Sequence, residues 1–242
     1  MDLQAVLFDL DDTLHDDTAA YHGAAARVAR DVAGESGVAA DPLLAAYIAQ
    51  AERFWSGLSS ATLEMPLGHL RARMWHAALS ASGLDDLALA ERCAIAYNAY
   101  RRDLLELWPG SLELLQRLRA DGLKLGLITN GFSETHRDKI VLLELQDAFD
   151  EIFIADEVGM VKPDPRLFRL AAERLGVAPE SCAMVGDRFD RDVRGAAAVG
   201  MFTVWVNVRN EAVPADLRPN AVVARIGEVA GVLPLPGKRS RA

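Results

Sequence analysis

The sequence predicts an α/β protein with a mostly parallel sheet and an inserted helical region. Three observations support this fold class. After residue 110, short apolar segments alternate with amphipathic helical patterns, as in consecutive βαβ units. The apolar segments are rich in Val, Ile and Leu, which is typical of strands buried on both faces. Between residues 19 and 107 the pattern is helical, with little sign of a strand.

The chain opens with a strand candidate that ends in carboxylates. Residues 6–8 (Val-Leu-Phe) lead directly into Asp9-Leu10-Asp11-Asp12-Thr13. Strand alternation would direct Asp9 and Asp11 to the same side. Like charges this close repel, and a divalent cation such as Mg²⁺, which prefers oxygen ligands, would compensate for the repulsion. Taken alone, the stretch is equally compatible with a solvated acidic turn after an edge strand.

The inserted region reads as a small bundle of four helices. Asp41-Pro42 is typical of a helix start, with a capping residue followed by proline in the first turn. Trp108-Pro109-Gly110 ends the region. For Arg71 and Arg73 we expect a solvated helix face rather than substrate contact. The expected helices cover residues 21–33, 43–58, 69–81 and about 85–107.

The remainder of the chain alternates between the two types of element. Leu112, Leu115 and Leu118 recur at helical spacing, whereas residues 123–128 (LKLGLI) form a continuous apolar segment. The expected helices cover residues 111–120, 133–145, 165–175 and 193–199, and the expected strands cover 123–128, 151–155, 181–185, 201–206 and 221–224.

Polar residues follow several of these strands. Asp9 to Asp11 follow the first, Thr129-Asn130-Gly131 the second, and Gly186-Asp187 a later one. Lys162 lies in the loop that follows the strand candidate at 151–155. Because ligands in parallel sheets bind at the carboxyl ends of the strands, we expect these four sets to converge on one crevice.

The converging groups suit a phosphate and Mg²⁺. Asp9 can attack phosphorus, and Asp11 can give a proton to the leaving oxygen and later take one from water. Mg²⁺ can lie between carboxylates of different loops and the phosphate. Lys162 adds positive charge where the transition state spreads negative charge. Thr129, Asn130 and the amide of Gly131 can donate hydrogen bonds to phosphate oxygens.

These residues resemble the motifs of the haloacid dehalogenase-like (HAD) hydrolases. Asp9-Leu10-Asp11-Asp12-Thr13 matches the first motif, and Thr129 at a strand end matches the second. Lys162 before Pro163 matches the third, and the acidic segment 186–192 (GDRFDRD) matches the fourth. All four occur in the family's order, and the resemblance extends from about residue 6 to residue 223.

The resemblance implies a Rossmann-like catalytic core and a helical cap. The core would comprise residues 1–18 and 108–236, and the cap residues 19–107. It also implies that Asp9, the main-chain carbonyl of Asp11 and Asp187 hold Mg²⁺. Asp192 matches the second acidic position, where we expect it to support Lys162 or a metal-bound water; a simple helix cap is the alternative.

Within the family, the segment 129–132 (TNGF) is most similar to the nucleotide and sugar-acid phosphatases, such as the pyrimidine 5′-nucleotidases and N-acylneuraminate-9-phosphatase. Arg188 and Arg191 stand where many relatives have smaller polar residues. We expect them to form salt bridges with nearby acids, although substrate contact is the alternative.

Several neighbouring polar residues are expected to have structural roles. Asp12 would shape its turn, and Thr13 would hydrogen-bond backbone near the nucleophile. Asp164 and Asp190 would be solvated or form turns. The five histidines show no metal-ligand spacing, so none is expected to be a ligand; they are His15, His22, His69, His76 and His136.

Composition limits the other classes of function. A formal net charge of −9 disfavours binding to nucleic acid polymers, and no apolar run approaches the roughly 20 residues of a membrane span. Asp2 stands where an export signal would have basic residues, and Cys93 and Cys182 suit free thiols in a reducing cytoplasm. We expect a cytoplasmic monomer or homodimer whose tail, residues 237–242, is disordered.

The sequence therefore predicts a Mg²⁺-dependent phosphatase that acts on a small phosphorylated metabolite, such as a nucleotide or a sugar phosphate. A 2-haloacid dehalogenase of the same fold is the first alternative, disfavoured because halide needs no proton from Asp11. A phosphomutase is the second, and it would need an aspartyl-phosphate that survives water. A non-catalytic binding module would be expected to lack Asp9 or Asp11, and both are present.

Overall fold

The computed structural model describes residues 2–235 and divides into two compact units. The core unit consists of Met1–Asp16 and Leu107–Ala242, and the helical unit of Asp17–Glu106. The chain leaves the core unit after Asp16 and re-enters it at Leu107, and hydrogen bonds join the core residues that flank these two points. The carbonyl of Leu14 accepts from the Trp108 amide (2.9 Å) and from Ser111 Oγ (2.7 Å).

The core unit is built on one parallel sheet of six strands, in the order β3-β2-β1-β4-β5-β6. This is the strand order of the Rossmann fold, so the predicted fold class is confirmed. The strands are β1 (Ala5–Phe8), β2 (Lys124–Thr129), β3 (Glu151–Ile154), β4 (Cys182–Gly186), β5 (Phe202–Val206) and β6 (Ala221–Val223).

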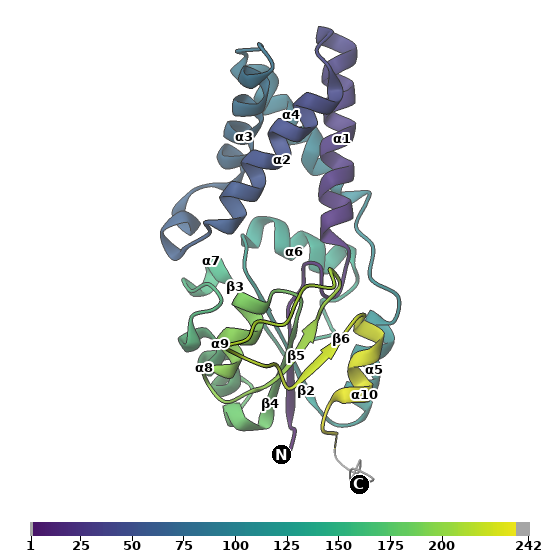
Figure 1. Cartoon of the computed structure of the whole chain (residues 1–242), viewed down its shortest axis with the longest axis vertical. Helices are drawn as coiled ribbons and strands as arrows, with labels where there is room; N and C mark the ends of the chain where they lie inside the picture. Colours follow the sequence, from purple (N-terminus) through teal and green to yellow (C-terminus); the bar gives the residue numbers. More distant parts are fainter. Residues whose placement is uncertain (1, 236–242) are drawn as a thin grey trace. The chain divides into compact units, whose positions relative to one another are not determined.

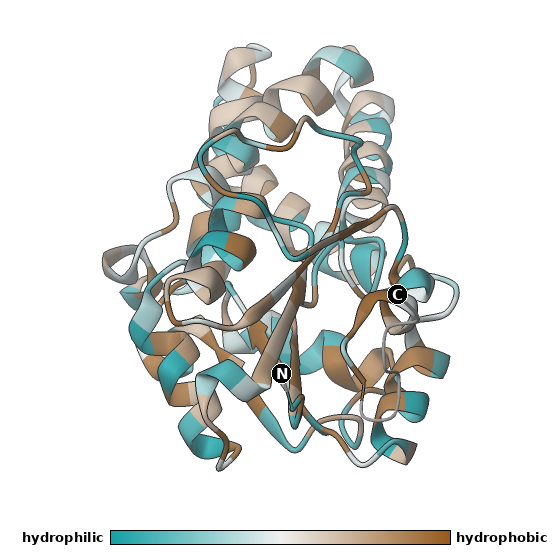
Figure 2. Ribbon diagram, turned by 60° about the horizontal axis from the view of Figure 1, so that its bottom comes forward, coloured by the Kyte–Doolittle hydropathy of each residue, from teal (hydrophilic) through white to brown (hydrophobic). Residues whose placement is uncertain are grey.

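Close packing on both faces explains why the central strands are apolar throughout, as their colour in Figure 2 shows. All four residues of β1 are buried. At Gly126 in β2, a Cβ atom would lie 2.6 Å from Leu7 Cδ2, so the glycine admits the neighbouring side chain. On one face, Phe168 packs so tightly that a Cβ at Gly195 would lie 2.2 Å from its ring.

Helices cover both flanks of the sheet, with α5 (Ser111–Ala120) and α10 (Val229–Val232) on one side and α8 (Pro165–Arg174) and α9 (Arg194–Ala197) on the other (Figure 1). The longer helices agree with the predicted ones to within about five residues at each end. The exceptions are short. The last predicted helix, 193–199, shortens to α9, and five further helical segments of the core unit were not predicted: α7 (Ala155–Val158), α10, η2 (Pro179–Ser181), the π-helical turn η3 (Phe189–Val193) and η4 (Ile226–Glu228). Segments of four or five residues are too short to show a hydrophobic period.

The helices of the core unit are α5 (Ser111–Ala120), α6 (Ser133–Leu142), α7 (Ala155–Val158), α8 (Pro165–Arg174), α9 (Arg194–Ala197) and α10 (Val229–Val232). Short turns of other helical types are η2 (Pro179–Ser181), η3 (Phe189–Val193) and η4 (Ile226–Glu228).

The helical unit contains the four predicted helices and one additional 3₁₀ turn. Its core is aromatic: Tyr47 stacks on Trp75 with ring centroids 3.9 Å apart, and Tyr97 packs beside both. The elements are α1 (Asp17–Ser36), α2 (Ala40–Ser56), η1 (Ser60–Glu64), α3 (Leu67–Ala81) and α4 (Leu87–Arg102).

Two expectations for this unit were wrong. Arg71 is buried, not solvated: its guanidinium lies over the Tyr97 ring and donates to Asn98 Oδ1. The aromatic ring and the amide together replace the water that a buried guanidinium loses. Asp41 does not cap α2, because the helix begins one residue earlier and Asp41 lies within its first turn. Arg73 is exposed, as expected.

Other expectations concern the whole chain. Cys93 and Cys182 are both buried free thiols, as predicted. None of the helices in the described part of the chain is long and apolar enough to cross a membrane. The expected disordered tail, residues 237–242, lies outside the described residues.

Candidate active site

The polar groups predicted to converge lie at the carboxyl edge of the sheet, all within the core unit. Asp9 directly follows β1, Thr129 is the last residue of β2, and Asp187 directly follows β4. Lys162 lies in the loop that follows α7. The side chains of Asp9, Thr129, Lys162 and Asp187 are all buried, which excludes the alternative of a solvated acidic turn for Asp9.

Lys162 joins two buried carboxylates. Its Nζ lies 2.7 Å from Asp9 Oδ1 and 2.7 Å from Asp192 Oδ1. The other oxygen of Asp192 accepts from the amide of Arg188 at 2.9 Å, which fixes the carboxylate within the π-helical turn η3. Asp192 therefore pairs with Lys162, whereas the alternative of a simple helix cap does not apply, because Asp192 lies inside η3 and the residue that precedes this turn is Arg188.

Gly186 makes room for Asp192. A Cβ atom on Gly186 would lie 2.3 Å from Asp192 Oδ2 and 2.4 Å from its Cγ, closer than van der Waals contact allows. The glycine at the end of β4 thus lets the carboxylate lie directly against the strand and reach Lys162.

The Gly186→Ala variant is expected to lose about 1–3 kcal/mol of unfolding free energy, the usual range for overpacking a filled site. The added methyl would push Asp192 away from Lys162. Urea denaturation of the purified protein measures the effect. Gly231→Ala is the matched control, because a Cβ there meets nothing within 4 Å. Equal stability of the two variants would show that Asp192 does not depend on this contact.

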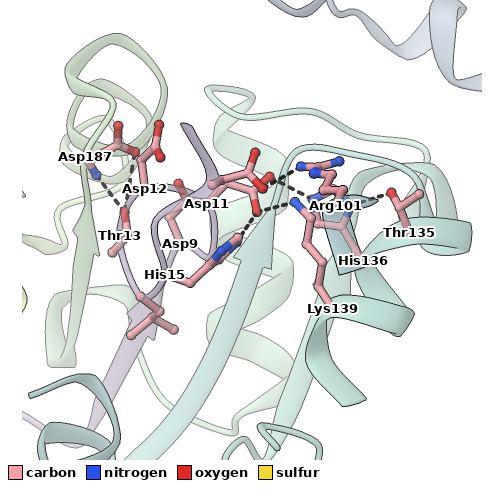
Figure 3. A network of polar contacts seen from close by, with 12 residues as sticks. Asp9, Asp11, Asp12, Thr13, His15, Arg101, Thr135, His136, Lys139 and Asp187 are labelled. Carbon is pink, nitrogen blue, oxygen red and sulfur yellow. Dashed lines mark hydrogen bonds and ion pairs between the residues drawn. The ribbon is translucent and has the colours of Figure 1, made fainter. Parts of the chain in front are cut away.

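Asp187 is held from several directions. Thr13 Oγ1 accepts from the Asp187 amide at 2.9 Å and lies 3.4 Å from Asp187 Oδ1. Thr13 was expected to hydrogen-bond backbone near the nucleophile, and its partner is the amide of Asp187, whose carboxylate lies within 4.8 Å of that of Asp9. Trp205 Nε1 donates to the Asp187 carbonyl at 2.8 Å. These contacts tie the loops after β1 and β4 together, as the left part of Figure 3 shows for Thr13 and Asp187.

Arg209, in the loop after β5, is a residue that the sequence reasoning missed. Its guanidinium lies 2.8 Å from Asp187 Oδ2 and 2.8 Å from Asp12 Oδ2. Asp12 has a positive φ of 58°, so it shapes the turn as expected, and it is also half of an ion pair. Arg209 follows β5, and ligands in parallel sheets bind at the carboxyl ends of the strands, so this rule could have drawn attention to Arg209.

In the buried cluster around Lys162, three carboxylates face one ammonium; the acids are Asp9, Asp187 and Asp192. Burial raises the pKa of Asp9 to about 6, although the Lys162 ammonium opposes the shift. Burial and the nearby Asp9 and Asp192 carboxylates raise the pKa of Asp187 well above its usual value. Burial disfavours the charged form of Lys162, but Asp192 and Asp9 outweigh it and raise the pKa of the lysine. An additional cation would relieve the excess of negative charge.

A metal ion fits this set of donors. Asp9, Asp187 and Asp192 each offer a carboxylate oxygen, and these oxygens all lie within 4.8 Å of one another. All three residues are buried, and a cluster of carboxylate oxygens is the donor set that hard divalent cations prefer.

The side chain of Asn130 bonds the main chain of Lys162, and its expected contact with phosphate stays a prediction. Its Oδ1 accepts from the Lys162 amide at 2.7 Å, and its Nδ2 donates to the Lys162 carbonyl at 2.9 Å. The carboxamide therefore locks the lysine loop to the end of β2. A contact from Asn130 to phosphate would have to use its backbone amide or the remaining side-chain N–H.

The Asp11 carboxylate has partners that differ from those of Asp9. His15 Nε2 and Lys139 Nζ lie 2.9 and 2.6 Å from Asp11 Oδ1, and His136 Nε2 lies 3.3 Å from Oδ2. Burial would raise the pKa of Asp11, but Lys139 and His136 outweigh it and hold the pKa well below its usual range. Sequence reasoning missed this group, since neither histidine is near the other in sequence.

One acid of the fourth motif, Asp190, has a partner that was not predicted. Arg194 lies 2.9 Å from Asp190 and 2.6 Å from Asp216 on the surface. Asp190 is thus exposed and ion-paired, and the roles expected for Arg188 and Arg191 stay predictions.

Asp164 caps α8 by accepting from the Arg166 amide at 2.9 Å, which agrees with its expected structural role.

The arrangement of these motifs agrees with a comparison with known families. The model of the haloacid dehalogenase-like hydrolase family matches residues 3–200, which includes all four motifs. The chain belongs to this family. It is therefore a hydrolase, and the resemblance inferred from the motifs is confirmed.

Curated relatives of this HAD hydrolase include named phosphatases. Glyceraldehyde 3-phosphate phosphatase of Methanopyrus kandleri is 34% identical over 205 residues, covering 84% of each chain. N-acylneuraminate-9-phosphatase of Rattus norvegicus is 32% identical over 169 residues, covering 68% of this chain and 67% of the relative. The similarity to the sugar-acid phosphatases, first seen in residues 129–132, therefore extends well beyond that segment.

A solved structure in the family shares the fold. The 2-haloacid dehalogenase from Pseudomonas syringae pv. Tomato DC3000 superposes with a TM-score of 0.67 at 28% identity, covering 95% of this chain and 97% of that chain. The same fold thus occurs in proteins named for two different reactions, so the reaction of this chain has to be inferred from its site residues rather than from its fold.

Proposed function

We propose that this HAD hydrolase is a Mg²⁺-dependent phosphatase that hydrolyses a small phosphomonoester through an aspartyl-phosphate intermediate. One observation carries the proposal: the buried Asp9 carboxylate is paired with Lys162 at 2.7 Å, and a second acid, Asp11, lies two residues further along the same loop. A buried nucleophile beside a cation, with a separate carboxylate available for proton transfer, is the set of groups that phosphoryl transfer through aspartate requires.

Asp9, the main-chain carbonyl of Asp11 and Asp187 would hold the Mg²⁺ ion. The buried carboxylates of Asp9 and Asp187 fit this role, because burial and neighbouring carboxylates raise their pKa values and a bound cation would stabilise their charged forms. When bound, the ion would supply positive charge to a phosphoryl oxygen. Arg209 forms ion pairs with Asp187 and Asp12 at the margin of this site.

The chain's own residues account for the remaining chemistry. A carboxylate oxygen of Asp9 attacks phosphorus in line, and the bond between phosphorus and the ester oxygen breaks. Asp11 gives a proton to that leaving oxygen. A water molecule then attacks the acyl phosphate, with Asp11 accepting its proton, and free phosphate and the Asp9 carboxylate are regenerated. Asp192 keeps Lys162 directed at Asp9 throughout.

Phosphate would be bound by groups at the end of β2 and by Lys162 in the loop after α7. Thr129 lies at the end of β2, and the backbone amides of Asn130 and Gly131 follow it. Lys162 supplies the positive charge, and the Asn130 carboxamide holds its main chain in place. The expected contribution of Lys162 is electrostatic, since negative charge spreads over the transferring phosphoryl group.

Dehalogenation is the second candidate, because the Pseudomonas syringae dehalogenase shares the fold. In that reaction Asp9 would attack carbon and displace halide, which needs no proton from Asp11. The cluster of Asp9, Asp187 and Asp192 oxygens would also have no evident purpose in a reaction without metal. A phosphomutase stays the third candidate.

For the substrate, we propose a nucleotide, a sugar phosphate or a similar small phosphorylated metabolite. The named relatives act on phosphates of this size. We further propose that the helical unit, Asp17–Glu106, is the cap and selects among substrates, and that the protein works in the cytoplasm as a monomer or homodimer without nucleic acid or membrane partners.

Release of inorganic phosphate is the direct test. The purified protein should release phosphate from several members of a panel of nucleotides, sugar phosphates and phosphorylated acids with Mg²⁺ present. A parallel assay for halide release from 2-haloacids tests the alternative. Halide release without phosphate release from any ester would replace the proposal with dehalogenation.

Removal of the metal is expected to abolish phosphate release, and added Mg²⁺ should restore it. Excess Mg²⁺ should also raise the melting temperature of the metal-free protein, because an ion that binds only the folded state stabilises it. Differential scanning calorimetry with and without chelator measures this second effect independently of activity. Full activity in excess chelator would exclude the metal role of Asp9 and Asp187.

A further inference from the structure

Helix α6 carries two polar side chains that are buried in the core unit. His136 is 2% exposed and Lys139 is 3% exposed. They are three residues apart, so both lie on the same face of the helix. Figure 3 shows that both point toward Asp11, which lies on a different segment of the chain.

The contacts hold the Asp11 carboxylate by both oxygens. Lys139 Nζ donates to Oδ1 at 2.6 Å, and His15 Nε2 lies 2.9 Å from the same oxygen. On the other side, His136 Nε2 lies 3.3 Å from Oδ2. With partners on both oxygens, rotation of the carboxylate about its own axis would break at least one contact. The orientation of Asp11 is therefore set by α6 and His15.

The backbone before α6 is shaped to allow this arrangement. His136 Nδ1 lies 3.1 Å from the carbonyl of Phe132, which orients the ring. A Cβ on Gly131 would lie 1.9 Å from His136 Cε1, so only glycine lets the ring lie against the loop. The segment proposed to bind phosphate is thus continuous with the helix that orients Asp11.

Asp11 and Lys139 differ in how far their side chains are exposed, and this indicates different roles. The Asp11 side chain is 28% exposed, so its carboxylate can reach a ligand, whereas the Lys139 side chain is only 3% exposed. Lys139 is thus placed to act through Asp11 rather than by touching a substrate. Because a buried ammonium needs a compensating carboxylate, the pair is expected to stay together.

We propose that Lys139, assisted by His136, is the positioning residue that directs the Asp11 carboxylate toward the leaving oxygen. This inference rests on the proposed phosphatase function and deepens it, because it names a residue outside the four motifs. A lysine that merely anchored α6 would affect every substrate equally. A lysine that positions the proton donor affects only substrates whose leaving group needs a proton.

The test is the Lys139→Met variant, assayed with two esters in the presence of Mg²⁺. Glycerol phosphate has an alkoxide leaving group that needs a proton. The leaving group of p-nitrophenyl phosphate is p-nitrophenolate, which can leave without a proton. We expect kcat/KM for glycerol phosphate to fall about 100-fold and that for p-nitrophenyl phosphate to fall less than about 5-fold, since general acid catalysis contributes about 10² or more. The Lys139→Arg variant should recover part of the loss.

The choice of kcat/KM matters, because it reports the steps up to loss of the alcohol and is insensitive to later hydrolysis of the acyl phosphate. Arg137→Met is the matched control: Arg137 lies on the same helix but is exposed and pairs with Glu157. The control should keep the wild-type ratio of the two kcat/KM values.

If Lys139→Met does not fold, Lys139→Gln and His136→Gln serve the same purpose, and a smaller change in the same ratio is expected. An unchanged ratio in the folded variants would overturn the positioning role. An absence of phosphate release by the wild-type protein would instead refute the proposed function, so the two failures are distinguishable.

Discussion

Replacing Asp9 with asparagine is expected to lower the phosphatase kcat by about 10⁴-fold or more, the scale seen when a covalent nucleophile is removed. The carboxamide of the variant would keep the size of the side chain but could not attack phosphorus. Inorganic phosphate release from p-nitrophenyl phosphate with Mg²⁺ present measures the loss. Folding should survive, since the raised pKa of Asp9 shows that its charge is costly in the buried site.

Asp12→Asn is the matched control for this variant. It lies in the same loop and changes the charge by the same amount, but its carboxylate faces Arg209 rather than Lys162. We expect its kcat to stay within about 10-fold of wild type, because a partly exposed ion pair contributes little to the site. If the two variants lost activity equally, the loop's total charge would matter rather than a nucleophile at Asp9.

Replacing Lys162 with methionine is expected to lower both stability and activity. The variant would leave Asp9 and Asp192 buried without the ammonium that lies 2.7 Å from each. Breaking such a buried pair by removing one partner costs about 3–5 kcal/mol, and loss of a preorganised charge at the phosphoryl group should cost about 10²–10³ in kcat. Urea denaturation and phosphate release measure the two effects.

The control for the second variant is Lys124→Met. Lys124 begins β2, at the end of the strand opposite Thr129, and its ammonium donates to the carbonyl of Leu175. Its removal should leave kcat unchanged and cost far less stability than the loss of Lys162. A Lys162→Met protein as stable and as active as this control would contradict the role assigned to the Lys162 contacts.

The order and type of the main elements were predictable because each leaves a local pattern. Strands buried on both faces are continuous apolar runs. Because the carboxyl ends of parallel strands lie at one edge of the sheet, Asp9, Thr129 and Asp187 were predicted to lie together there. Elements of four or five residues, such as α7 and η3, leave no such pattern.

The contacts within the site were less predictable, because they depend on the directions of side chains. The sequence pattern places Lys139 and His136 on one face of a helix, but nothing in it indicates that this face meets Asp11, 128 residues from Lys139. Likewise, Asn130 follows a strand as a phosphate-binding residue would, yet its carboxamide binds the Lys162 backbone. Only the packing of the loops reveals such partners.

Gly186 illustrates the same limit. In sequence it is one glycine before an aspartate, and its importance comes from the side chain of Asp192, six residues later, folding back to within 2.3 Å of where a Cβ would lie. The fourth motif therefore combines a local turn with a long-range ion pair to Lys162.

The phosphorylated enzyme itself provides the most direct test of the proposed mechanism. A single turnover with a phosphomonoester and Mg²⁺, quenched in acid and digested, should yield a peptide that carries one phosphoryl group on Asp9 when analysed by mass spectrometry. The Asp9→Asn protein should yield none. Turnover with no phosphoryl group on the wild-type peptide, or with the group on another residue, would contradict the assignment of Asp9 as the nucleophile.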